Sequence, residues 1–96
     1  ISYLPIAEND LAEILLFINE RNPVAAQKLY ATMNERIALL ARNPELGVVP
    51  KDETIQKTGH RVLIVEKYLV FYVISEDAVQ IRRVLHGAQD LTDLIF

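Results

Sequence analysis

Two residues near the end of the chain have side chains that could do acid–base chemistry. Arg83 and His86 are close together in the sequence, and an imidazole beside a guanidinium can bind an anion or transfer a proton near neutral pH. Arg61 is a third candidate, because its guanidinium could clamp a phosphate. The alternative for the first two is structural: His86 would cap the end of a strand through a backbone hydrogen bond, and Arg83 would be a solvated edge residue.

Other kinds of catalytic site are excluded by composition. The chain has no cysteine, so disulfides, thiolate metal sites and cysteine nucleophiles are ruled out. The two histidines, His60 and His86, have no carboxylate at metal-ligand spacing. No glycine-rich phosphate loop is present, and the only serines, Ser2 and Ser75, do not lie in a nucleophile elbow. We therefore expect no metal and no cofactor.

The candidates lie on three predicted strands in the last third of the chain. Apolar runs at 61–65, 68–74 and 79–85 are joined by connections too short for a helix, which predicts an antiparallel meander. Alternate strands of a meander run parallel, so Arg61 at the start of one and His86 at the end of another belong at opposite ends of the sheet. Arg82 and Arg83 must point to opposite faces unless a β-bulge intervenes. The sequence thus does not bring all three candidates into one site.

The first half of the chain predicts a short strand and two helices. Ile1 to Leu4 suit a strand, and apolar residues at helical spacing predict a helix from Pro5 or Ile6 to Arg21. A second helix begins at Asn22-Pro23 and continues to Ala41. Residues 44–60 read as an extended loop with a turn near 53–55, and residues 91–96 as a final helical turn. The prediction is one α+β domain over residues 1–96, ordered β-α-α-β-β-β, with a helical hairpin packed on a small antiparallel sheet.

Two groups of apolar residues exceed what one core requires. Leu16 and Phe17 broaden the apolar stripe of the first helix, either to touch a partner or to cap the edge of the core. Tyr68, Val70 and Tyr72 share one face of the central strand, and the opposite face is also apolar. Because two helices cover only one face, we expect a partner protein on the other.

The charge of the chain and the length of its apolar runs limit its binding partners and its location in the cell. A formal net charge of −3 over 96 residues argues against affinity through phosphate contacts, and we expect no direct sequence-specific DNA binding. No apolar run approaches the ~20 residues that cross a bilayer. The start lacks the order of a signal peptide, so we expect a cytoplasmic protein with no membrane contact.

Short motifs follow one another in a fixed order along almost the whole chain. They are Ala7 with Asp10-Leu11 and Ile14, Asn22-Pro23 with Ala26 and Leu29, Leu40 with Pro44 and Gly47, Gly59-His60-Arg61, Tyr68 with Phe71-Tyr72, and Arg83-Val84-Leu85-His86-Gly87. Together they resemble the RelE/ParE superfamily of toxins from bacterial type II toxin–antitoxin systems. The resemblance implies growth inhibition, plasmid stabilisation, and a cognate antitoxin that lies on the toxin as helix and strand. We assign the surplus apolar residues to antitoxin binding: Leu16, Phe17, Tyr68, Val70 and Tyr72.

The superfamily divides by activity. RelE-type members cleave messenger RNA on the ribosome with basic residues on the sheet, whereas ParE-type members poison DNA gyrase. Leu63 and Leu69 stand where the nucleases tend to place Lys or Arg, and Ala88 to Asp90 replace a basic run. The resemblance therefore favours a ParE-like gyrase poison. The alternatives are a messenger RNA interferase using His86 with Arg61 and Arg83, and an inactive homologue that acts as an antitoxin-binding or co-repressing module.

Overall fold

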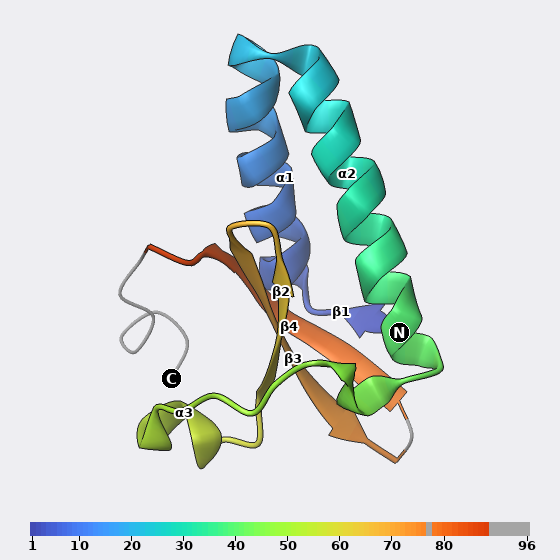
Figure 1. Cartoon of the computed structure of the whole chain (residues 1–96), viewed down its shortest axis with the longest axis vertical. Helices are drawn as coiled ribbons and strands as arrows, with labels where there is room; N and C mark the ends of the chain where they lie inside the picture. The colour runs from blue at the N-terminus through green and yellow to red at the C-terminus, as the bar shows by residue number, and fades with distance from the viewer. Residues whose placement is uncertain (77, 89–96) are drawn as a thin grey trace.

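The computed structural model describes residues 1–76 and 78–88 as a helical hairpin on a four-stranded sheet (Figure 1). The predicted α+β fold is confirmed. In chain order the elements are β1 (Ser2–Tyr3), α1 (Pro5–Arg21), α2 (Pro23–Ala38), the 3₁₀ turns η1 (Leu39–Ala41) and η2 (Pro44–Leu46), α3 (Glu53–Gln56), β2 (Arg61–Val65), β3 (Tyr68–Ser75) and β4 (Ala78–His86).

One residue both ends α1 and starts α2. The Asn22 backbone N–H donates to the carbonyl of Ile18 at 2.8 Å, and its side-chain oxygen accepts from the N–H of Ala25 at 3.1 Å. Pro23 occupies the first turn of α2. Backbone N–H groups in the first turn have no intrahelical acceptor, so a proline there costs no hydrogen bond. The sharp antiparallel turn predicted at Asn22-Pro23 is confirmed, and the two helices rise side by side above the sheet (Figure 1).

The sheet has the strand order β1-β4-β3-β2. The pairs β2–β3 and β3–β4 are antiparallel, as predicted for a meander. In contrast, β1 pairs parallel to β4, with Ser2 opposite Gln80 and Tyr3 opposite Ile81. The sheet is therefore mixed, because the chain crosses over through the helical hairpin before it reaches the strand beside β1.

A β-bulge lies at the adjacent arginines. Phe71 faces Arg83 and Tyr72 faces Ile81, so Arg82 is the extra residue on β4. The bulge shifts the alternation: Val84 joins the core beneath the helices, whereas Leu85 belongs to the opposite face. From the sequence, Arg82 and Arg83 were expected either to point to opposite faces of the sheet or to lie at a β-bulge.

The helices cover the face of β3 that we had assigned to the antitoxin. Tyr68, Val70 and Tyr72 are 7%, 0% and 0% exposed and lie in the core formed with α1 and α2. The prediction that this face points outward is wrong. Both faces of β3 are apolar, so alternation along the strand did not distinguish them, and the crossover from β1 decided which face the helices cover.

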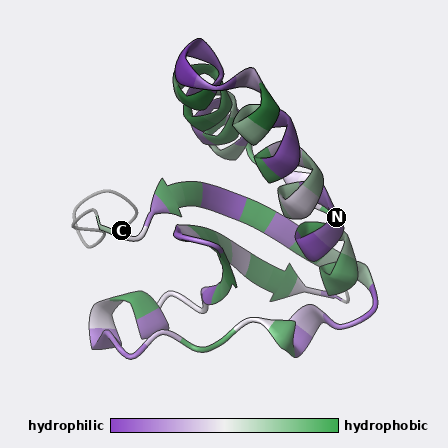
Figure 2. Cartoon of the chain, turned by 45° about the horizontal axis from the view of Figure 1, so that its top comes forward, coloured by the Kyte–Doolittle hydropathy of each residue, from purple (hydrophilic) through white to green (hydrophobic). Residues whose placement is uncertain are grey.

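The chain itself covers much of the second face. Ile55 in α3 packs with Val62, Phe71 and Leu85, and the backbone of Val48 pairs with that of Val62 at 2.8 Å in both directions. Figure 2 shows the segment that carries α3 on the side of the sheet opposite the hairpin. The chain therefore covers Val62, Phe71 and Leu85 itself, whereas Ile64, which alternates onto the same face of β2 as Val62, is 52% exposed.

Tyr72 fastens the segment between α2 and α3 to the sheet. Its hydroxyl donates to the carbonyl of Pro44 at 2.6 Å and accepts from the N–H of Gly47 at 2.9 Å. Gly47 has no room for a side chain, because an added Cβ would lie 2.6 Å from the Tyr72 hydroxyl and 2.7 Å from the Val62 carbonyl oxygen.

We expect Tyr72→Phe to lower the free energy of unfolding by about 1–3 kcal/mol, since it leaves the buried Gly47 N–H without its acceptor. Urea denaturation followed by circular dichroism measures the change. Tyr30→Phe is the matched control, because that ring is half exposed. Equal stability of the two variants would contradict the role of the Tyr72 hydroxyl.

His60 makes the fold sensitive to acid. The ring is buried and its Nδ1 lies 2.6 Å from the Thr58 hydroxyl oxygen. Burial, and secondarily the charge of Arg82, lowers the pKa of His60 below its usual value. The folded protein thus favours the neutral ring, whereas the unfolded chain takes up a proton near pH ~6.5.

We therefore expect stability to be fully present above pH ~6.5 and to fall as the pH drops below that value, because protons bind preferentially to the unfolded state. Urea midpoints measured across this range test the slope, and His60→Phe should flatten it. The same slope in both proteins would show that other groups cause it.

Candidate functional site

Arg61 holds the loop that precedes α3. Its Nη2 donates to the carbonyl of Glu45 at 3.0 Å and to that of Gly47 at 2.8 Å. Arg61 lies opposite Tyr72 on β3, so the guanidinium and the Tyr72 hydroxyl fasten the same segment. Arg61 is the first residue of β2, and the predicted meander had already separated it from His86 at the end of the last strand.

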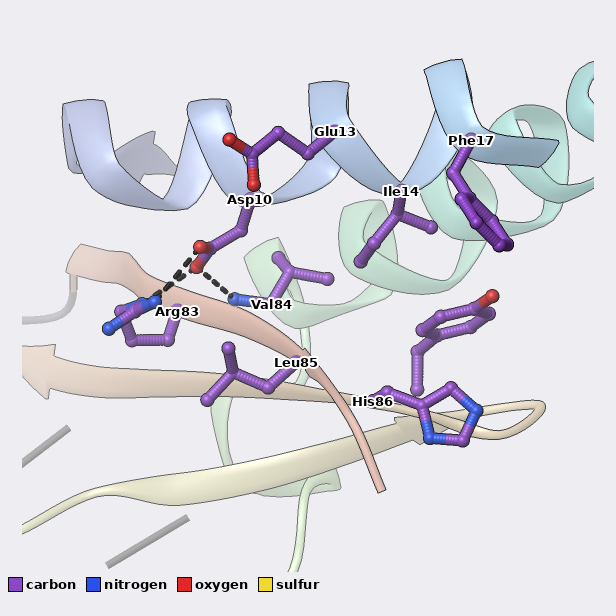
Figure 3. A pocket seen from close by; sticks show the side chains of 9 residues that line it. Asp10, Glu13, Ile14, Phe17, Arg83, Val84, Leu85 and His86 are labelled. Carbon is purple, nitrogen blue, oxygen red and sulfur yellow. Dashed lines mark hydrogen bonds and ion pairs between the residues drawn. The ribbon is translucent and has the colours of Figure 1, made fainter. Parts of the chain in front are cut away.

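Arg83 forms an ion pair with Asp10 of α1. The Nε and Nη2 atoms donate to the two carboxylate oxygens at 2.7 and 3.0 Å, and the Val84 N–H donates to the same carboxylate at 3.0 Å. The Arg83 and Asp10 side chains are only 15% and 10% exposed. The hydrogen bonds that Arg83 donates to Asp10 raise the pKa of Arg83. Arg83 is therefore not the solvated edge residue of the alternative reading (Figure 3).

The Asp10 carboxylate also closes part of a sheet edge. β1 covers β4 only at Gln80 and Ile81, and the Val84 N–H beyond them would otherwise be open to another strand. From the sequence, Asp10 was singled out only as part of a motif in the first helix. No local signal in the sequence connects it with an arginine 73 positions away.

His86 ends β4 and packs on Tyr68. The two residues face each other across the strands, with ring centroids 5.4 Å apart and planes at 82°. The Nδ1 atom accepts from the Ala88 N–H at 3.0 Å, which places the proton of the neutral ring on Nε2. The structural alternative for His86, a cap at the strand end, is thus confirmed.

The three predicted catalytic residues do not meet. Arg61 lies opposite Tyr72 in the middle of β3, whereas His86 lies opposite Tyr68, the first residue of β3. Arg83 and His86 do share one pocket. Residues 89 and 90, where the sequence lacks a basic run, and the predicted turn at 91–96 lie outside the described residues. Within residues 1–76 and 78–88, no three metal-ligating side chains gather, and no helix has both the length and the apolar character to span a bilayer.

The pocket that Arg83 and His86 share lies between α1 and the end of β4. Its volume is about 460 Å³. Asp10, Glu13, Ile14 and Phe17 line it from α1, and Tyr68 lines it from β3. Figure 3 shows Ile14 and Phe17 pointing from the helix toward the strand end. We call this cavity the α1–β4 pocket. Its walls are mainly apolar and its floor is the Asp10–Arg83 ion pair.

Next to this pocket, α1 presents apolar side chains to solvent. Leu16 and Phe17 are 63% and 60% exposed, so of the two alternatives left open for them, capping of the core edge is disfavoured. The Arg21 guanidinium stacks over the Phe17 ring at 4.1 Å from its centroid. Of the five residues assigned to partner binding, only these two are accessible, because Tyr68, Val70 and Tyr72 are buried beneath the helices.

Comparisons with known proteins agree with this architecture. No curated protein matches the chain significantly. A solved structure described as the chromosomal ParDE TA system from P. aeruginosa matches with a TM-score of 0.72 and 20% identity, covering 88% of this chain and 91% of that one. Residues 1–91 match the family of the ParE toxin of type II toxin-antitoxin system, parDE. The chain therefore belongs to the ParE toxin family of type II toxin–antitoxin systems.

Proposed function

We propose that this toxin arrests growth by inhibiting DNA gyrase and that its cognate antitoxin neutralises it by covering the outer face of α1. Family membership implies the antitoxin. The observation that carries the choice of gyrase is the match of residues 1–91 to ParE toxins. The site of action is the cytoplasm, where gyrase works on the chromosome.

The geometry of the candidate residues argues for a toxin without nuclease activity. Cleavage of a phosphodiester requires an acid, a base and charge stabilisation around one phosphate. Arg61 is held by loop carbonyls and Arg83 by Asp10. Arg61 lies opposite Tyr72 in the middle of β3, whereas His86 lies opposite Tyr68, the first residue of β3. This arrangement supports inhibition of gyrase over cleavage of ribosomal messenger RNA.

A supercoiling assay with purified gyrase tests the proposed target. We expect the toxin to block supercoiling of relaxed plasmid, and addition of the antitoxin encoded beside the toxin gene to restore it. His86→Ala should still block supercoiling, since His86 serves as a strand cap.

Two results would overturn the target. Normal supercoiling together with messenger RNA cleaved on ribosomes, lost in His86→Ala, would identify a nuclease. Normal growth when the toxin is expressed without antitoxin would identify an inactive antitoxin-binding module.

The antitoxin surface is proposed from exposure. Leu16 and Phe17 present apolar area to solvent on the outer side of the hairpin, and exposed apolar groups of this kind are typical of protein interfaces. Phe17 also lines the α1–β4 pocket, so the surface and the pocket are continuous.

A further inference from the structure

We propose that the α1–β4 pocket receives an apolar side chain of the antitoxin, and that a Lys or Arg next to that side chain pairs with Glu13. The inference rests on the proposed antitoxin surface on α1. It adds the chemistry of the contacting segment: one apolar anchor with a neighbouring positive charge.

The shape of the pocket suits an apolar anchor. Ile14, Phe17 and Tyr68 supply its walls, and the polar groups of its floor already bond to one another in the Asp10–Arg83 pair. An apolar side chain entering here would leave those polar groups paired, so no buried donor or acceptor would be stranded. The volume of about 460 Å³ exceeds the ~150 Å³ that accommodates benzene in a protein core.

The charge at the rim of the pocket selects a positive neighbour. Residues 1–20 contain four acidic side chains and no Lys or Arg. Asp10 is satisfied by Arg83. Glu13 is exposed, accepts a 3.3 Å hydrogen bond from the Asn9 amide, and forms no ion pair with a cation of residues 1–76 and 78–88.

The same charges disfavour other occupants. A nucleic acid would bring phosphates against Glu13, which repels them. A second copy of the chain meeting this face about a two-fold axis would place Glu13 and Glu20 of both copies at one interface. An antitoxin segment with an apolar residue beside a Lys or Arg complements both the apolar walls and the acidic rim.

The test compares two charge reversals on the same helix. Glu13→Lys changes the rim of the α1–β4 pocket, whereas Glu8→Lys changes an exposed residue at the separate pocket formed with Tyr3 and Tyr30. Titration of each toxin with the cognate antitoxin gives the Kd. We expect Glu13→Lys to weaken binding about 10-fold or more at low salt, with a smaller loss at high salt, and Glu8→Lys to bind within about twofold of the unchanged toxin. Glu13→Gln should fall between them.

Backbone amide shifts during the same titration test the apolar anchor. Large shifts are expected at Ile14, Phe17 and Val84 to His86, which border the pocket. The proposal is overturned if the pocket signals do not shift, if Glu13→Lys binds as tightly as Glu8→Lys, or if the free toxin dimerises through this face. Inhibition of gyrase by the free Glu13→Lys toxin, measured in parallel, separates the two proposals. If this variant still inhibits gyrase and binds the antitoxin with unchanged affinity, the proposed role of the pocket is wrong while gyrase remains the proposed target.

Discussion

Asp10→Ala is expected to lower the free energy of unfolding by about 3 kcal/mol, because it removes a nearly buried ion pair with Arg83 and the acceptor of the Val84 N–H. The carboxylate accepts from Arg83 at 2.7 and 3.0 Å and from the Val84 N–H at 3.0 Å. One substitution therefore removes an ion pair and a backbone acceptor, at the point where α1 is fastened to β4.

Urea denaturation measures this loss, and two variants separate its causes. Glu13→Ala, one turn further along α1 and exposed, should change stability by less than about 0.5 kcal/mol. The double variant Asp10→Ala with Arg83→Met should recover part of the loss, since it also removes the charged Arg83 guanidinium. A loss in Asp10→Ala no greater than in Glu13→Ala would contradict the importance of the pair.

The second large effect concerns the antitoxin. We expect the double variant Leu16→Ala with Phe17→Ala to weaken antitoxin binding about 100-fold, since a few apolar anchors carry most of the energy of an interface. The fold should persist, because these side chains are 63% and 60% exposed. Growth arrest by the toxin should then continue even when the antitoxin is co-expressed.

The Kd from calorimetry and growth curves under co-expression check this result. Val48→Ala with Val49→Ala is the matched control, because it removes half-exposed apolar side chains from the loop on the other side of the sheet. The interface would lie elsewhere if the antitoxin bound the Leu16 and Phe17 double variant with unchanged affinity, or if its affinity for the control variant fell by the same factor.

The elements of this fold were readable from local patterns. Asn22-Pro23 predicted where one helix ends and the next begins, and the observed hydrogen bonds of Asn22 carry out both roles. The strand starting at Arg61 was predicted with its observed bounds. Capping and alternation depend on neighbours a few residues apart, so the sequence contains their signal.

Two features of the site depend on contacts that local patterns do not record. Tyr68, Val70 and Tyr72 alternate along a strand whose two faces are equally apolar, and only the crossover from β1 placed that face beneath the helices. Asp10 reads as a solvated helix residue until the fold brings it to Arg83.

The sequence by itself determined the helices, the meander, and the separation of Arg61 from His86, but left open whether Leu16 and Phe17 are exposed. Tertiary structure decided which sheet face is buried and gave both arginines structural partners. The physical reason is that propensity and capping act between close neighbours, whereas burial and ion pairing act between residues that the folded backbone brings together.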